Sequence, residues 1–129
     1  YVNNKGESKM WFIVILCLVI GVLLGLQMPF MVPIFLTKYL SVAILAGLDS
    51  LFGGIRANLE GNFDRVVLLT GFITNSLLAA GFAYIGDLLG VALYTAAVFV
   101  FGVRIFDNLA IIRRILLTLI RKQQTEAII

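Results

Sequence analysis

Ionisable and amide side chains within otherwise apolar sequence are the residues of this chain best able to bind a ligand. They are Asp49, Arg56, Arg104, Asp107 and Asn108. A charged group inside a hydrocarbon layer is costly unless it is paired or hydrated, so each needs a partner. One interpretation is a belt of ion pairs that locks helices together. The other is a site for an anionic ligand or partner, with Arg56 and Arg104 as hydrogen-bond donors.

Asp49 and Arg104 are the two side chains best placed to pair directly. Helix starts near Ile34 and Leu88 put them at nearly equal positions along two helices that run in the same direction. At ~1.5 Å per residue, both lie about 22–24 Å from those starts. The sequence therefore predicts an Asp49–Arg104 ion pair.

Thr74 and Asn75 are polar residues near the middle of another apolar run. An amide at this depth usually forms a hydrogen bond between helices, either within one chain or between copies. A contact with a substrate is the alternative.

The residues that most enzymes and metal sites use are scarce. The chain has no histidine and one cysteine, Cys17, which lies in an apolar run. It has no glycine-rich phosphate loop, no Cys/His set with metal-ligand spacing, and no Ser–His or Cys–His pair. We therefore expect no enzymatic activity, no catalytic residue, no metal site and no cofactor. We also expect no nucleic-acid partner.

Two uncharged stretches indicate the class of the protein. They are residues 10–37 and residues 66–86, and neither contains a charged side chain. About 20 apolar helical residues cross a hydrocarbon core of roughly 30 Å, and a helix satisfies its own backbone polar groups there. The chain is 61% hydrophobic with a mean hydropathy of +1.07. These features predict an all-α integral membrane protein.

Prolines, glycines and polar loops divide the chain into four predicted transmembrane helices arranged as two hairpins. The helices are expected over residues 10–28, 34–56 and 64–86, and from residue 88 or 91 to beyond residue 103. Residues 1–9 are predicted to be a disordered leader or a vector-derived remnant, residues 10–122 a single transmembrane helical domain, and residues 123–129 a short tail.

The second of these helices could instead lie on the membrane surface, and the positions of lysine and arginine favour a full span. Cytoplasmic loops carry an excess of these residues. With four spans and cytoplasmic termini, the inner side receives Lys5, Lys9, Arg56, Arg65, Arg113, Arg114, Arg121 and Lys122. Lys38 alone falls near the outer side, where it can snorkel from a helix end.

Small residues predict close helix packing. Gly21 and Gly25 form a GxxxG pattern in the first span, and Gly53, Gly54 and Gly102 accompany the arginine-bearing segments. The segment Leu51–Arg56 is weakly similar to Val100–Arg104, which leaves a duplicated hairpin open. We expect a homo-oligomer.

The end of the fourth helix is amphipathic and basic. Isoleucine and leucine recur every four residues from Ile111 to Ile120, and the other face carries Arg113, Arg114, Arg121 and Lys122. Such a helix suits anionic lipid headgroups on the inner leaflet. Docking to a partner protein is the alternative.

Four blocks of the sequence carry a family resemblance. They are YLSVAILAGLD at 39–49, FGGIRA at 52–57, FITN at 72–75 and FGVRIFDNLAIIRR at 101–114. The chain resembles the bacterial small basic protein family, a group of short membrane proteins of unknown function. The resemblance implies work in cell division or envelope biogenesis, because genes of the family tend to lie in the division and cell-wall cluster. It supplies no catalytic residues, and the tail here is less basic than is usual in the family.

Together these observations predict a non-enzymatic, multi-pass protein of the bacterial plasma membrane. It would assemble with itself or with division or envelope proteins. The alternative is a small transporter or channel subunit, with an anion or ion path lined by the intramembrane Asp, Arg and Asn side chains.

Overall fold

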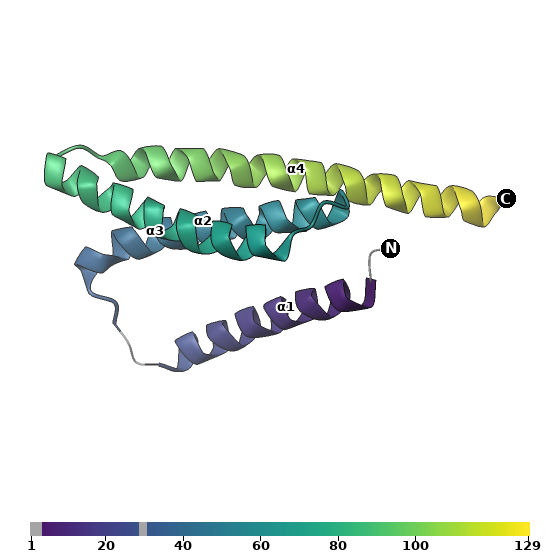
Figure 1. The fold of residues 1–129 in the computed structure, drawn as a ribbon, viewed down its shortest axis with the longest axis horizontal. Helices are drawn as coiled ribbons and strands as arrows, with labels where there is room; N and C mark the ends of the chain where they lie inside the picture. Colours follow the sequence, from purple (N-terminus) through teal and green to yellow (C-terminus); the bar gives the residue numbers. More distant parts are fainter. Residues whose placement is uncertain (1–3, 29–30) are drawn as a thin grey trace. The chain divides into compact units, whose positions relative to one another are not determined.

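The computed structural model describes residues 4–28 and 31–129, and every element in this part of the chain is a helix. Its elements are α1 (Asn4–Gln27), α2 (Ile34–Leu59), α3 (Arg65–Leu89) and α4 (Leu93–Ile128) (Figure 1). They divide into two units, residues 1–33 and residues 34–129. The predicted all-α class is therefore confirmed.

The first unit contains α1. Most of its apolar side chains from Phe12 to Leu26 are exposed. A Cβ added at Gly21 or Gly25 would meet no atom within 4 Å. The leader predicted as disordered is helical from Asn4, and residues 1–3 lie outside the described residues.

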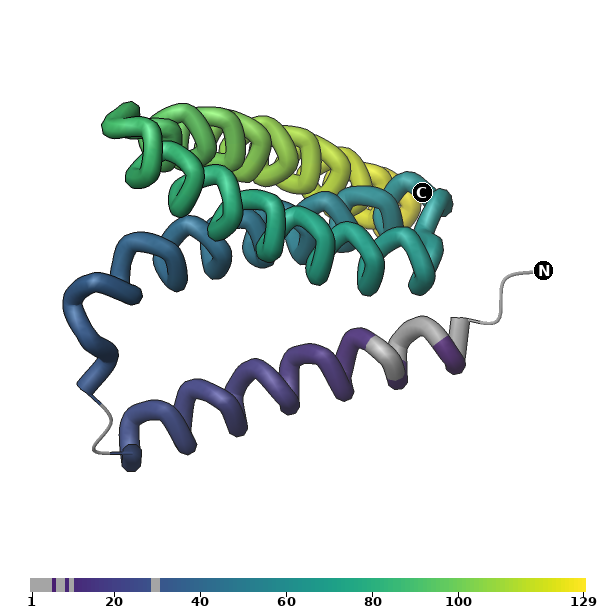
Figure 2. The backbone as a smooth tube through the Cα atoms, turned by 60° about the vertical axis from the view of Figure 1, so that its left-hand side comes forward, coloured from purple at the N-terminus to yellow at the C-terminus, as the bar shows by residue number. Residues whose placement is uncertain are grey.

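The second unit is a bundle of three helices. α2 packs against both α3 and α4, which also pack against each other (Figure 2). The centre consists of small residues, because these let the backbones approach closely. It contains Val42, Ala46, Ala79 and Ala97, with Tyr94 and Phe101 packed against them.

Local signals explain where the helices of the bundle begin and end. The Asp64 carboxylate caps α3 by accepting hydrogen bonds from the backbone N–H groups of Val66 and Val67. Gly90 ends α3 in the left-handed conformation, with a φ of 70°. The predicted start of the fourth helix at residue 88 or 91 is therefore too early, because Asp87–Leu89 still belong to α3.

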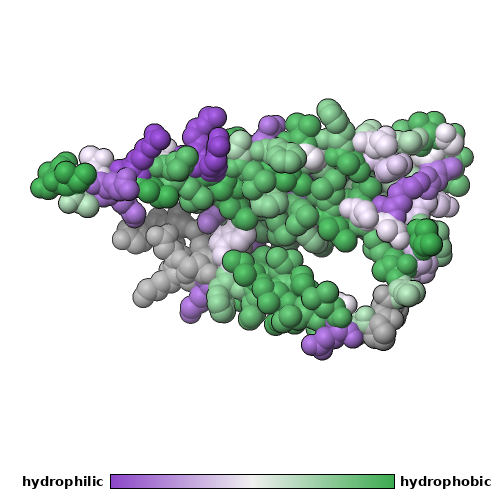
Figure 3. Space-filling model, turned by 180° about the vertical axis from the view of Figure 1, so that it is seen from behind, coloured by the Kyte–Doolittle hydropathy of each residue, from purple (hydrophilic) through white to green (hydrophobic). Residues whose placement is uncertain are grey.

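α2, α3 and α4 are each long and apolar enough to cross a membrane. The apolar part of α1, Trp11–Gln27, is shorter. Apolar side chains also dominate the face of the molecule in Figure 3, as expected where the surroundings are lipid. The structure thus has the helices of a membrane protein, whereas four full spans, two hairpins and cytoplasmic termini stay predictions.

α4 is the longest helix, with 36 residues. It continues through residues 123–128, which were predicted to form a tail. Glutamine, glutamate and alanine dominate this stretch, and all three favour a helix.

We predict that Gly86→Ala destabilises the bundle. A Cβ at Gly86 would lie 2.5 Å from the Val91 carbonyl oxygen and 2.8 Å from the Leu93 Cβ, so the α3–α4 turn would have to open. We expect a loss of about 1–3 kcal/mol in the free energy of unfolding, the usual range for overpacking. Titration with SDS, followed by circular dichroism, measures this change.

Gly81→Ala is the matched control, because a Cβ there meets nothing within 4 Å. It should be neutral or stabilising by up to about 1 kcal/mol, since alanine favours a helix. Equal effects of the two substitutions would contradict the tight turn.

Candidate functional site

Many polar side chains of the bundle belong to two groups. The first group, called the loop-end cluster, lies in the half of the bundle nearer the α2–α3 loop and consists of Asp49, Arg56, Glu60, Arg104 and Asn108. The second, called the turn-end cluster, lies near the α3–α4 turn and consists of Lys38, Tyr39, Asp87 and Tyr94. Each group joins helices that are far apart in the sequence.

Asp49 and Arg104 meet in the loop-end cluster. The Arg104 Nη2 atom lies 3.2 Å from the Asp49 Oδ2 atom. The Asp49 side chain is fully buried, whereas 55% of the Arg104 side chain is exposed. Neither Asp49 oxygen has a hydrogen-bond donor in good geometry among the described residues, so Arg104 supplies the compensation by charge. This contact ties α2 to α4.

The two residues meet although their helix starts are not level. α2 begins at Ile34 and α4 begins at Leu93, so Arg104 lies closer to the start of its helix than Asp49 does. The difference corresponds to about 6 Å along the helix axis, or roughly one turn. At the end of the bundle where both helices begin, α2 therefore extends beyond the start of α4.

Arg56 lies at the centre of a second set of contacts between the same helices. Its Nε atom donates to the Glu60 Oε1 atom at 3.0 Å, one turn along α2. Its Nη1 atom donates to the Asn108 Oδ1 atom on α4 at 3.3 Å. Asn108 is buried, so this hydrogen bond satisfies an amide that water does not reach easily.

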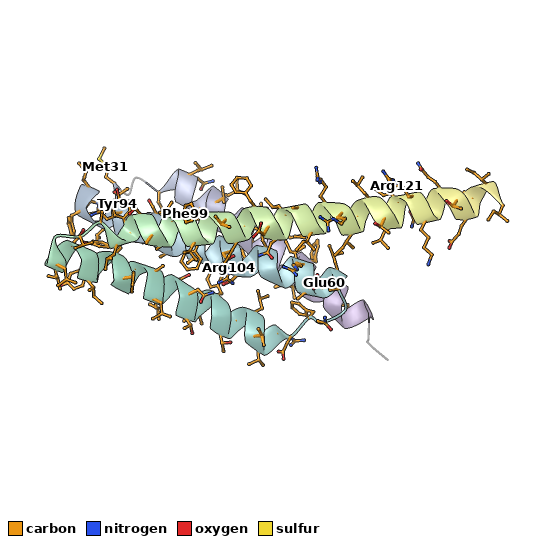
Figure 4. All side chains as sticks on the ribbon, turned by 90° about the horizontal axis from the view of Figure 1, so that it is seen from above. Met31, Glu60, Tyr94, Phe99, Arg104 and Arg121 are labelled. Atoms are coloured by element: carbon orange, nitrogen blue, oxygen red, sulfur yellow. The ribbon has the colours of Figure 1, made fainter. Side chains whose placement is uncertain are left out.

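Two pockets flank Arg104. The larger, about 360 Å³, is lined by Gly53, Arg56, Ala57, Glu60, Arg104, Asp107 and Asn108. The smaller, about 230 Å³, lies between α2 and α3 and is lined in part by Asp49, Ser50, Asn75 and Arg104. Either could admit several water molecules, each of which occupies roughly 30 Å³. Figure 4 shows Arg104 and Glu60 along this part of the molecule.

The charges that line the larger pocket balance. Arg56 and Arg104 contribute two positive charges, and Glu60 and Asp107 contribute two negative charges. Each arginine is also already engaged by a carboxylate, Arg56 by Glu60 and Arg104 by Asp49. An incoming anion would have to displace one of these carboxylates, so the pocket has little excess attraction for it.

Asn75 connects α3 to α2. Its Nδ2 atom donates to the Ser50 Oγ atom at 3.2 Å, and the Ser50 hydroxyl donates in turn to the Ala46 carbonyl at 3.3 Å. The Asn75 amide therefore forms a hydrogen bond between helices within one chain, which was one of the two arrangements predicted for it. Thr74 lies on the exposed side of α3.

The remaining predicted residues differ in how closely they pack. Gly54 faces Leu68, and a Cβ at Gly53 would lie 3.7 Å from Asn108. A Cβ at Gly102 would meet nothing within 4 Å. The basic side chains of the α4 end are exposed; they are Arg113, Arg114, Arg121 and Lys122.

The turn-end cluster is one that sequence reasoning missed. The Lys38 Nζ atom lies 2.6 Å from the Asp87 Oδ1 atom, and the Tyr39 hydroxyl donates to the Asp87 Oδ2 atom. The Lys38 ammonium also lies 4.9 Å from the centre of the Tyr94 ring on α4. Asp87 thus joins α3 to α2.

Tyr84 completes this end of the bundle. Its ring packs edge-on against Tyr39, with centroids 6.2 Å apart. One feature of the sequence could have indicated the turn-end cluster. The predicted outer side carries tyrosines in addition to its single lysine, and tyrosine concentrates at membrane interfaces. In the part of the chain that the structure describes, no group of three or more His, Cys, Asp or Glu side chains could hold a metal ion.

Comparison with known proteins identifies the family. Residues 32–117 match the family described as "Protein of unknown function (DUF1290)". The chain is 50% identical over 109 residues to the "Small basic protein" of Bacillus subtilis (strain 168). The aligned region covers 84% of this chain and 89% of the relative. The chain belongs to this family.

Mycobacterial relatives extend the similarity. The chain is 46% identical over 115 residues to uncharacterised proteins of Mycobacterium bovis (strain ATCC BAA-935 / AF2122/97) and Mycobacterium tuberculosis (strain ATCC 25618 / H37Rv), covering 84% of this chain and 95% of each relative. No solved structure matches the chain. The family match includes both polar clusters but ends before Thr118, within α4.

We predict that Arg104→Ala is far more damaging than Asp49→Asn. The first substitution leaves a buried carboxylate without its compensating charge, which typically costs about 3–5 kcal/mol, at the lower end here because Arg104 is half exposed. The second removes the buried charge and leaves Arg104 able to reach water. SDS unfolding measures both losses.

The double variant Asp49→Asn/Arg104→Ala supplies the control. It should recover most of the stability lost in Arg104→Ala, because no buried charge remains. Additive losses in the double variant would contradict the pairing.

We predict a small effect of Lys38→Met on the free energy of unfolding. Both partners of the Lys38–Asp87 pair are more than a third exposed, at 38% and 36%, and solvent screening leaves exposed pairs with little effect on stability. The same SDS titration measures it. A loss as large as that of Arg104→Ala would show that the turn-end cluster, and not the loop-end cluster, holds the bundle together.

Proposed function

We propose that this protein is a non-enzymatic component of the bacterial plasma membrane that assembles with itself or with proteins of cell division or envelope biogenesis. Its helical bundle would act as a fixed core, and its exposed surfaces would make the contacts with lipid and with partners. Bacterial relatives support this localisation, and the resemblance to the small basic protein family supports the link to division.

The compensated charges of the loop-end cluster are the observation that carries the proposal. Arg56 and Arg104 are the side chains most suited to bind an anion at membrane depth, and a carboxylate already engages each of them. The contacts of Asp49, Arg104 and Asn108 join α2 to α4. This arrangement favours a structural role for the charges over a role in binding or transport.

A transporter or channel subunit is the second candidate, and the two pockets beside Arg104 are the observation in its favour. The balanced charge of the larger pocket weighs against an anion path. Chloride and phosphate flux into proteoliposomes separates the two proposals. Flux that depends on Arg104 would favour transport, and the absence of flux would favour a structural core.

We predict that a fluorescent fusion of the full chain is enriched at the division septum. The fusion would replace the small basic protein of Bacillus subtilis, its 50% identical relative. The fusion signal at the septum, divided by the signal of a membrane dye, corrects for the two membranes there. A ratio equal to that of the lateral membrane would contradict the division link.

The Asp49→Asn/Arg104→Ala variant is the control for this measurement. If the pair is structural, the double variant should fold and keep the septal enrichment of the unmodified chain. If Arg104 binds an anion needed for function, the double variant should fold and lose the enrichment.

A further inference from the structure

α4 continues well beyond the helices it packs against. At the loop end of the bundle, α2 ends at Leu59 and α3 begins at Arg65, whereas α4 runs on to Ile128 (Figure 1). Figure 4 shows Arg121 on the part of α4 that extends past Glu60. Ile112 is the last buried residue of α4, and the helix that follows it adds about 24 Å.

The extension continues the face by which α4 packs into the bundle. That face carries Ala97, Phe101, Asn108 and Ile112. With about 3.6 residues per turn, Ile115 and Leu119 continue the same side of the helix, and Leu116 and Ile120 lie next to them around the helix. We call these four residues the apolar extension face. Leu116, Leu119 and Ile120 are 44–51% exposed, and Leu119 lies in line with a helix-packing surface. Where such a patch faces water, it marks a binding site.

A lipid surface does not suit this face. The sequence has no glycine or proline from Val103 to Ile129, and these residues are the usual causes of a sharp kink. If α4 crosses the membrane as one continuous helix, its extension projects away from the bilayer instead of lying along it. Arg113 and Arg114 can still reach headgroups where α4 leaves the bilayer.

A second copy of the chain does not suit the face either. Copies inserted in the same direction have parallel α4 helices. The side of the apolar extension face that carries Ile115 and Leu119 looks toward the space below α2 and α3, because it continues the packing side of α4. A second α4 extension placed in that space would continue upward into the position that α2 and α3 of the first copy already occupy. The occupant must therefore be a segment that does not enter the membrane at this point.

Charge indicates the chemistry of the occupant. Arg113 and Lys122 lie at the two edges of the apolar extension face, and Arg114 and Arg121 lie on the back of the helix. The sequence from Arg113 to Ile129 has Glu126 as its one acidic side chain. A partner with carboxylates beside its apolar contacts would be complementary, and basic segments would be repelled.

We infer that the apolar extension face of α4 docks an amphipathic helix of another protein, with acidic side chains flanking its apolar stripe. The docked helix would lie directly below the α2–α3 loop and continue the bundle as a further packed helix. The inference rests on the proposed function, because it gives the partner-binding role a surface and a partner chemistry.

In-cell photo-crosslinking tests this surface in the full chain. A photo-reactive residue replaces Leu119, on the apolar extension face, or Leu117, two residues away and on nearly the opposite side of the helix. The two leucines are matched in exposure, at 49% and 46%. Mass spectrometry then maps the peptide that is crosslinked at each position.

We expect position 119 to crosslink an apolar segment flanked by aspartate or glutamate in a different protein, and position 117 to lack this product. A crosslink from 119 to a second copy, to another part of the same chain, to lipid or to a basic segment would overturn the inference. Equal products at both positions, or none at either, would also overturn it.

Charge reversal provides a second test that leaves the bundle intact. Arg113→Glu/Lys122→Glu reverses both edges of the face and should lower the yield of the 119 crosslink about tenfold, through two lost attractions and two new repulsions. Arg114→Glu/Arg121→Glu changes the net charge equally, but on the back of the helix, and should leave the yield unchanged. Equal losses in the two variants would contradict the proposed edges.

Septal enrichment in the same cells separates the two proposals. Enrichment without the 119 product would refute the docking face and leave the division link standing. The 119 product without enrichment would support the docking face and contradict the division link.

Discussion

The buried carboxylate of Asp49 constrains the rest of the bundle. A charge in an apolar interior is tolerated only beside a compensating charge, and Arg104 supplies one from α4 at 3.2 Å. This requirement limits how far α2 and α4 can slide past each other, because a slide of about one turn or more would separate the two groups. Arg56 and Asn108 join the same two helices further along, so two polar contacts set one register.

The small residues of the bundle complement this polar register. Lipid offers apolar surroundings as favourable as a protein core, so helices in a membrane gain little from burying leucine against leucine. Close backbone approach at Ala46, Ala79 and Ala97 supplies packing contacts in its place. Large side chains then point outward, and this explains a bundle whose centre is small while its surface is rich in exposed leucine, isoleucine and phenylalanine.

These two features lead to one view of function. The two arginines that could bind an anion are each engaged by a carboxylate. The turn-end cluster of Lys38, Tyr39 and Asp87 joins α2 and α3 at the other end in a similar way. The outer surfaces of the helices, above all the end of α4, are therefore the parts available for contacts with other molecules. In the proposed role, the membrane part holds α4 at a fixed position and orientation, and the extension presents a binding face at a fixed height.

Sequence alone determined the elements of this protein, because their signals are local. Charge-free runs of sufficient length identify apolar helices, Asp64 marks the start of α3, and the apolar–basic pattern marks the end of α4. The Asp49–Arg104 contact was predicted because two charges isolated in apolar sequence have few other partners, although the depth argument placed the start of α4 too early.

The tertiary structure decided which faces meet. Lys38 and Asp87 are 49 residues apart, and their contact depends on the rotation of α2 and α3 about their axes, which no local pattern specifies. For the same reason, the sequence could not show that Gly54 faces a neighbour and Gly102 does not. That Ile115 and Leu119 continue the packing face of α4 yet stay uncovered likewise follows from where α2 and α3 end. Local sequence sets the helices, and packing between distant segments sets their registers and the surfaces they leave exposed.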